Sequence, residues 1–184
     1  MTRIPKTLPI AIAALSLAAA ASIESLDLRK MVARADDAVA GTITAKRTTL
    51  VTDPMNGPQV YTWLTLKGTS LYTGQPTTKE VGFLGGSFGD YDYFVSTMPS
   101  PSETQPGNRV VVFSRREQDF GGPGNHAIYA ALGGIFRMQA GRGGEVALGK
   151  GKGFAIERTT YLADLMKTVP TLRAEIEREK KEVR

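Results

Sequence analysis

The chain has 184 residues, a length that fits one ordinary domain, and its 41% hydrophobic and 22% charged residues are typical of a globular protein. This composition excludes a wholly disordered or membrane-embedded chain, and a formal net charge of +5 is too small to indicate nucleic acid as the partner. The sequence contains no cysteine, which excludes disulfide bonds, thiolate metal sites and a cysteine nucleophile. The 20 glycines and 10 prolines favour short strands with frequent turns.

The first 21 residues have the pattern of a cleavable signal peptide. Arg3 and Lys6 precede an uncharged run over residues 8–21, which ends in four consecutive alanines. This run has 14 residues, fewer than the roughly 20 that cross a bilayer as a helix. The sequence therefore predicts a secreted bacterial-type protein, periplasmic or extracellular, with no stable membrane insertion after cleavage.

The next segments predict a short helix followed by a β-hairpin. Residues 23–35 have apolar side chains at helical spacing, with Ser25 or Asp27 as the N-cap. An alternating pattern starts at Asp37, and a turn rich in proline and glycine at residues 53–58 leads to a run of β-branched and aromatic residues at 60–66. The two runs are expected to pair.

The rest of the chain predicts further strands and then a helix. The strand candidates are residues 80–84, 91–97, 109–114, 127–132 and 135–139, with a weaker one around 146–148. A helical pattern begins near Thr159 and is expected to be interrupted at Pro170, before a charged, solvated tail.

These elements predict a mainly β fold of about six strands, with a short N-terminal helix and a C-terminal helix. The sheet is expected to form a small closed or partly open antiparallel barrel, OB-like, or a sandwich. The expected organisation is a signal peptide at residues 1–21, a β-barrel domain at 22–157 and a C-terminal helical segment with a charged tail at 158–184.

One motif points to a serine hydrolase. Residues 85–89 read G-G-S-F-G, which matches the G-x-S-x-G nucleophile elbow, and Asp119 and the only histidine, His126, follow Ser87 in the order acid, base. In such a triad the serine attacks, the histidine takes its proton and the aspartate orients the imidazole. The elbow requires a strand that turns into a helix, whereas the residues after Ser87 are typical of a strand or loop, so the alternative is a glycine turn in a β protein.

The segment after this motif contains the candidate binding residues Asp90, Tyr91, Asp92 and Tyr93. Two carboxylates fall short of the six to eight oxygen ligands that calcium prefers, and one histidine does not make a zinc site. The sequence therefore predicts neither a metal site nor a cofactor.

Several short motifs occur in a recognisable order along residues 26–139. They are LRKMVARAD at 28–36, YTWLTL at 61–66 followed by Lys67 and Gly68, the glycine pair 85–86, Pro106 and Gly107 before VVVF at 110–113, and GIFRM at 134–138. In these motifs the chain resembles a β-rich module of secreted bacterial proteins that sometimes precedes matrixin-like metalloprotease domains. The resemblance implies a small barrel of unassigned function, with a glycine turn at residues 85–86 and no catalytic residues to carry over.

Three functions are therefore open. The leading hypothesis is an exported, non-enzymatic β module that binds a protein or cell-envelope partner, because no motif forms a complete catalytic or cofactor site. The second is a small secreted serine esterase that uses Ser87 and His126. The third is an OB-like barrel that binds oligosaccharides or single strands, since that architecture hosts both.

Overall fold

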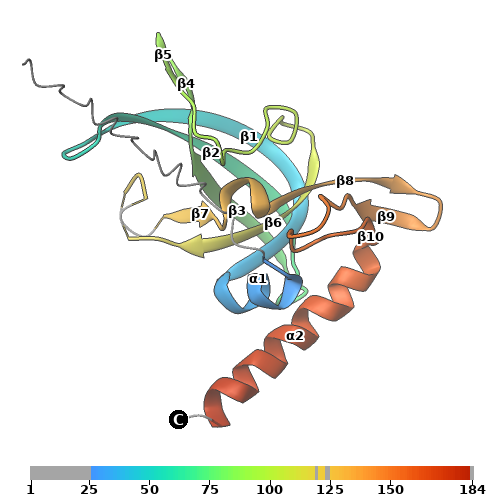
Figure 1. The fold of residues 1–184 in the computed structure, drawn as a ribbon. Helices are drawn as coiled ribbons and strands as arrows, with labels where there is room; N and C mark the ends of the chain where they lie inside the picture. The colour runs from blue at the N-terminus through green and yellow to red at the C-terminus, as the bar shows by residue number, and fades with distance from the viewer. Residues whose placement is uncertain (1–25, 119, 123–124, 183–184) are drawn as a thin grey trace, which may run out of the picture.

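The computed structural model describes residues 26–118, 120–122 and 125–182, so the predicted signal peptide lies outside the described residues (Figure 1). The elements are α1 (Leu28–Arg34), β1 (Asp37–Asp53), β2 (Gly57–Ser70), β3 (Pro76–Leu84), β4 (Gly86–Phe88), β5 (Tyr91–Tyr93), β6 (Arg109–Arg116), β7 (His126–Ile128), the 3-10 helix η1 (Ala131–Gly133), β8 (Ile135–Gly141), β9 (Gly144–Ala147), β10 (Thr160–Tyr161) and α2 (Leu162–Glu182).

Five strands form a partly open barrel. Strand β1 pairs with β2 along its length and with β6 over its first part, so it belongs to both sides of the ring. The ring continues from β2 to β3 and from β6 to β7, and one parallel pair, Gly82 with Ala127, joins β3 to β7. A register shift between Ile43 and Ala45 marks the bulge at which β1 bends. The predicted mainly β fold is confirmed, and the OB-like barrel fits this strand order rather than the sandwich.

Strands β7 and β8 lie along the same side of β6 and are separated by a short irregular segment. Tyr129 donates its backbone N–H to the Phe113 carbonyl, and Phe113 donates its own to the Gly134 carbonyl, so the pairing continues past the interruption. Strands β9 and β10 then extend the sheet beyond the ring. The described residues contain ten strands, more than the six expected, because short pieces such as β4 and β10 carry only weak sequence patterns. Of the predicted strand at residues 91–97, only β5 at Tyr91–Tyr93 forms.

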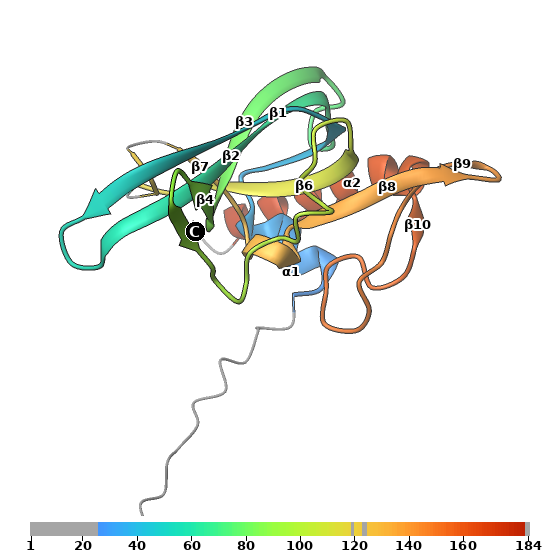
Figure 2. The ribbon, with the colours of Figure 1, turned by 90° about the horizontal axis from the view of Figure 1, so that it is seen from above.

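The apolar residues form two cores, because both faces of β1 and β6 are covered. Residues at alternate positions, including Val39, Ile43 and Val112, fill the barrel interior. Their neighbours face outward and pack under the helices, as Phe113 and Phe136 do. In Figures 1 and 2 both helices lie beneath the sheet, with β6 and β8 passing over them. The helices therefore cover one side of the barrel.

Both predicted helices are present, but the second is longer and more continuous than predicted. The Asp27 carboxylate accepts a hydrogen bond of 2.7 Å from the Lys30 N–H, which confirms Asp27 as the N-cap of α1. The predicted interruption at Pro170 is wrong, because α2 runs through it without a break. Proline removes one backbone hydrogen-bond donor from the helix. The helix stays continuous because Leu165, Val169 and Ile176, on both sides of Pro170, are buried in the core between the helices and the barrel.

Candidate functional site

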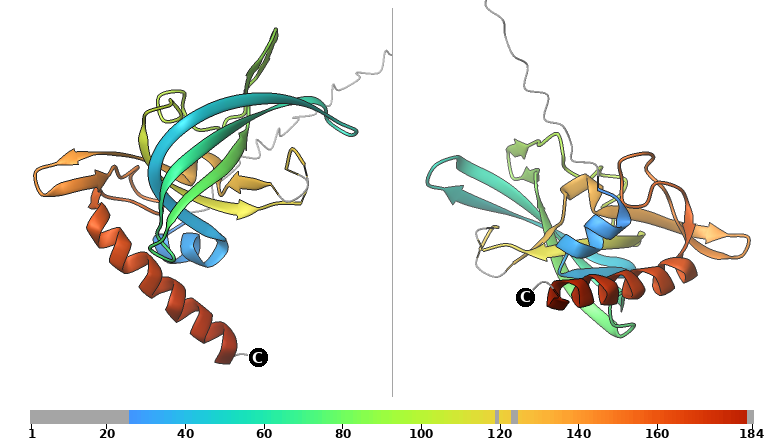
Figure 3. Two further views of the ribbon diagram at one scale, coloured as in Figure 1. Left: turned by 180° about the vertical axis from the view of Figure 1, so that it is seen from behind. Right: turned by 60° about the horizontal axis from the view of Figure 1, so that its bottom comes forward.

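A small hairpin, β4 and β5, stands out from the barrel on the side away from α2 (Figures 1 and 3). It leaves the end of β3 through Gly85 and Gly86, whose φ angles of 117° and 129° are strongly unfavourable for other residues. The Gly85 carbonyl accepts a 2.6 Å hydrogen bond from the buried Thr62 hydroxyl, and a Cβ on Gly86 would overlap that hydroxyl. The glycine pair is therefore a structural turn that starts the hairpin.

The hairpin exposes large aromatic side chains. Phe88 is 42% exposed, Tyr91 is 55% exposed and Phe94, which follows β5, is 75% exposed. At the tip of the neighbouring β1–β2 hairpin, Met55 is 93% exposed. These four residues account for most of the large apolar side chains that the described part of the chain presents to solvent. Met55 belongs to a different hairpin, so the exposed aromatic side chains of β4–β5 and of the residue after it form the candidate binding surface.

The four candidate binding residues all lie in this hairpin. Asp90 forms part of its turn, and the register pairs Phe88 with Tyr91, Ser87 with Asp92 and Gly86 with Tyr93. Both aspartates are exposed, while Tyr93 is half-buried. The hairpin thus carries two carboxylates beside its exposed aromatic rings.

Ser87 and His126, two of the candidate triad residues, occupy different parts of the fold. Ser87 is exposed in the middle of β4, within the small two-stranded sheet, and strand β4 runs into a turn rather than a helix. His126 begins β7 in the barrel sheet, where it pairs with Arg116. Asp119 lies outside the described residues. No hydrogen bond joins Ser87 to His126, and the buried Nδ1 of His126 has no hydrogen-bond partner among the residues that the structure describes.

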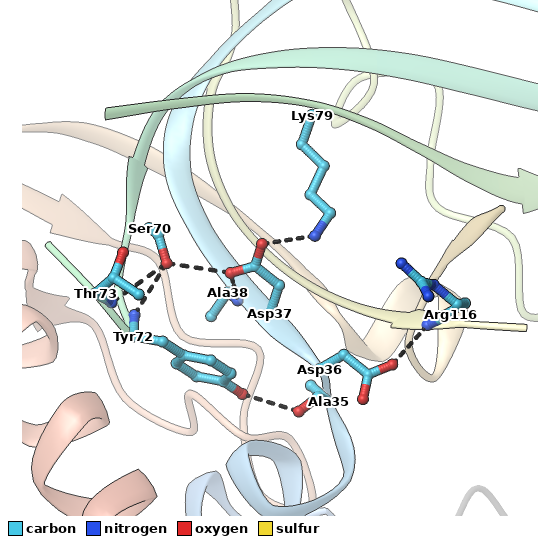
Figure 4. Close-up of polar contacts among 9 residues, drawn as sticks. All are labelled: Ala35, Asp36, Asp37, Ala38, Ser70, Tyr72, Thr73, Lys79 and Arg116. Carbon is cyan, nitrogen blue, oxygen red and sulfur yellow. Dashed lines mark hydrogen bonds and ion pairs between the residues drawn. The ribbon is translucent and has the colours of Figure 1, made fainter. Parts of the chain in front are cut away.

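His126 belongs to a polar end of the barrel that sequence analysis did not identify. The Asp37 carboxylate accepts hydrogen bonds from Lys79 Nζ at 2.6 Å, from Ser70 Oγ at 3.2 Å and from the Ala38 N–H at 2.8 Å (Figure 4). The Lys79 and Asp37 side chains are only 18% and 19% exposed. This contact ties together β1, β2 and β3. The partners are separated by 33 and 42 residues, so only the sheet register reveals them.

Burial and the neighbouring charges at this end of the barrel disfavour the protonated form of the His126 ring. Burial lowers the pKa of His126, and the positive charges of Lys79 and Arg116 lower it further, against a smaller opposite effect from Asp36 and Asp37. Asp36 accepts a 2.8 Å hydrogen bond from the Arg116 N–H, which joins the start of β1 to the end of β6 (Figure 4). The cluster closes one end of the barrel.

A second aromatic cluster, on the outer face of β2, is packed rather than exposed. The rings of Tyr61 and Trp63 are stacked with centroids 6.3 Å apart, and Phe120 contacts both edge-on. Trp63 Nε1 donates to the Thr49 hydroxyl at 2.9 Å, and the Arg47 guanidinium lies 5.3 Å from the Trp63 ring centroid. Tyr61 is 7% and Trp63 is 4% exposed, so these rings offer no open platform for stacking sugars or bases.

Comparisons of the chain with protein-family models, curated proteins and solved structures find no match. Across the described residues, no helix combines the length and apolar character needed to cross a bilayer. Nor do these residues contain a group of three or more histidine, aspartate or glutamate side chains placed to hold a metal ion.

Proposed function

We propose that the protein is an exported, non-enzymatic β-barrel module that binds a protein partner at the cell envelope through the tip of hairpin β4–β5. The observation that carries this proposal is the exposure of Phe88 and Tyr91 on one projecting hairpin and of Phe94 directly after it. Aromatic residues are enriched at protein interfaces, where they bury a large area at low entropic cost. Solvent-exposed rings on a domain with two filled cores favour a binding role.

The charges of the hairpin indicate the chemistry of the partner. Asp90 and Asp92 place two carboxylates beside the rings on a chain whose formal net charge is +5. A partner surface with an apolar patch flanked by lysine or arginine side chains complements this arrangement. Among the described strands, β4 and β5 pair only with each other, so their outer edges offer further backbone hydrogen bonds to such a partner.

The direct test is cross-linking of the mature protein in an envelope fraction, followed by titration of the identified partner in purified form. The triple variant Phe88→Ser, Tyr91→Ser, Phe94→Ser is expected to weaken affinity at least about tenfold, because interface aromatics typically contribute well over 1 kcal/mol each. The matched control is Tyr161→Ser with Met166→Ser, two other residues that are each 44% exposed. This control is expected to bind as the unmodified protein does.

Three results would overturn the proposal. One is full affinity of the hairpin variant for the purified partner, and another is an equal loss of affinity in the control variant. The third is hairpin-dependent binding to glycans or to lipid vesicles in place of protein. Substitution of Asp90 and Asp92 by asparagine is expected to reduce the association rate at low salt and to flatten its salt dependence.

A further inference from the structure

A mainly apolar cavity of about 410 Å³ lies beside β7, apart from the hairpin tip. Its volume falls within the range of about 300–1,000 Å³ that is common for small-molecule sites. The end of β3, the segment after β5 and the segment after β7 form its walls. Its lining includes the side chains of Leu84, Val95, Thr97, Phe120 and Ile128.

The wall after β7 has a strained backbone. Ala130 and Ala131 both adopt positive φ angles, 56° and 46°, although neither is glycine. Left-handed conformations of non-glycine residues are costly and persist where the surroundings impose them, often at ligand sites. Here the Leu132 N–H donates a 2.8 Å hydrogen bond to the Thr97 carbonyl, which joins this wall to the segment after β5. This hydrogen bond therefore holds two walls of the cavity together.

A second, more polar hollow adjoins the cavity and shares Glu117 and Phe120 with it. Its lining includes Arg115 and Arg116. Arg115 lies 3.0 Å from the Glu117 carboxylate and 5.0 Å from the Tyr129 ring centroid. Arg116 bonds Asp36 through its backbone N–H, and its guanidinium makes no ion pair within the described part of the chain. Among the described residues that line this hollow, the guanidinium groups of Arg115 and Arg116 outnumber the one carboxylate, that of Glu117.

We infer that these adjoining hollows bind a single-chain anionic amphiphile, with its hydrocarbon chain in the apolar cavity and its head group at Arg115 and Arg116. Each methylene group of a ligand that moves from water into the apolar cavity contributes about 0.8 kcal/mol to binding. This contribution favours a hydrocarbon chain over a polar solute. Guanidinium groups bind carboxylates and phosphates with paired hydrogen bonds. None of Phe88, Tyr91 and Phe94 lines either hollow, so different variants test amphiphile binding and the proposed partner binding.

The test uses the purified protein with a fluorescent fatty acid as the probe and palmitate as the competitor. Hexadecanol serves as the neutral comparison, and a lysophosphatidate separates a lipid phosphate head from a carboxylate. The double variant Arg115→Gln, Arg116→Gln is expected to weaken palmitate binding about tenfold and to change hexadecanol binding little, because only the charged head loses its partners. Arg142→Gln, an exposed arginine at the β8–β9 turn, is the matched control.

Cavity-filling variants test the hydrocarbon site separately. Val95→Trp and Thr97→Phe each place a large ring at the cavity wall and are expected to weaken both palmitate and hexadecanol, with circular dichroism and thermal unfolding used to confirm that each variant is folded. Two results overturn the inference. One is the absence of saturable palmitate binding, and the other is palmitate binding that neither the arginine pair nor the filling variants reduce.

Discussion

Tyr72 and Arg173 donate hydrogen bonds to the same two backbone carbonyl groups, those of Val32 and Ala35 at the C-terminal end of α1. The Tyr72 hydroxyl and Arg173 Nη1 each lie 3.3 Å from both oxygens, and the guanidinium lies 5.1 Å from the tyrosine ring centroid. Burial raises the pKa of Tyr72, which keeps its hydroxyl protonated as a donor. A residue from the turn after β2 and one from α2 thus jointly satisfy carbonyls that the short helix α1 leaves without partners.

This contact predicts coupled losses of stability. Tyr72→Phe and Arg173→Met should each lower the free energy of unfolding by about 1 kcal/mol, because each removes a donor and leaves most of the packing in place. The double variant should lose more than the sum, because either donor alone still satisfies the shared carbonyl oxygens and only the double variant leaves them unpaired. Urea unfolding of the four proteins measures the coupling. Strict additivity would show that the two donors act independently.

The ion pair between Lys79 and Asp37 predicts an asymmetric response to mutation. Lys79→Met leaves the poorly exposed Asp37 carboxylate without its counter-ion and should cost about 2 kcal/mol or more. Adding Asp37→Asn should recover part of that loss, because no unpaired charge then remains. Arg142→Met provides an exposed control with an expected change below about 0.5 kcal/mol. Chemical denaturation measures each free energy, and equal losses for Lys79→Met and Arg142→Met would contradict the prediction.

His126 predicts a pH dependence of stability. Its pKa is lowered in the folded protein, so the unfolded chain binds the proton more tightly and stability decreases as pH falls below the ordinary histidine value of about 6.5. The decrease should continue until the pH reaches the lowered pKa of the folded state. His126→Gln should remove this component, which thermal unfolding between about pH 7.5 and 5 would reveal. Identical pH profiles for the two proteins would refute the assignment.

The glycine turn predicts a contrast between two positions in the same hairpin. Gly86→Ala should destabilise the protein by about 2 kcal/mol, because its φ of 129° is strained for alanine and its Cβ would meet the Thr62 hydroxyl. Gly89→Ala should cost only about 1 kcal/mol, since its φ is 57° and the space around it is open. Thermal unfolding compares the two. A larger loss at Gly89 would show that the crowding at Gly86 has no energetic weight.

The candidate site shows where sequence reasoning stops. The sequence indicated Asp90, Tyr91, Asp92 and Tyr93 as candidate binding residues, but residue type alone does not distinguish exposed aromatic rings from packed ones. Tyr91 is 55% exposed and Trp63 is 4% exposed, although both lie in β segments that contain aromatic residues. The difference arises because β2 lies within the barrel wall and is covered by Phe120, whereas β5 pairs only with β4. Signal cleavage and export remain predictions from residues 1–21.

Local patterns in the sequence determined what depends on near neighbours. These features are the Asp27 cap, the hairpin turn at residues 53–58 and the alternation that directs apolar side chains inward, since each rests on contacts a few residues apart. Only the tertiary structure decided the closure between Gly82 and Ala127, the Asp37–Lys79 pair and the continuity of α2 through Pro170. These features depend on distant segments, whose meeting is set by sheet register and burial and leaves no local signal in the sequence.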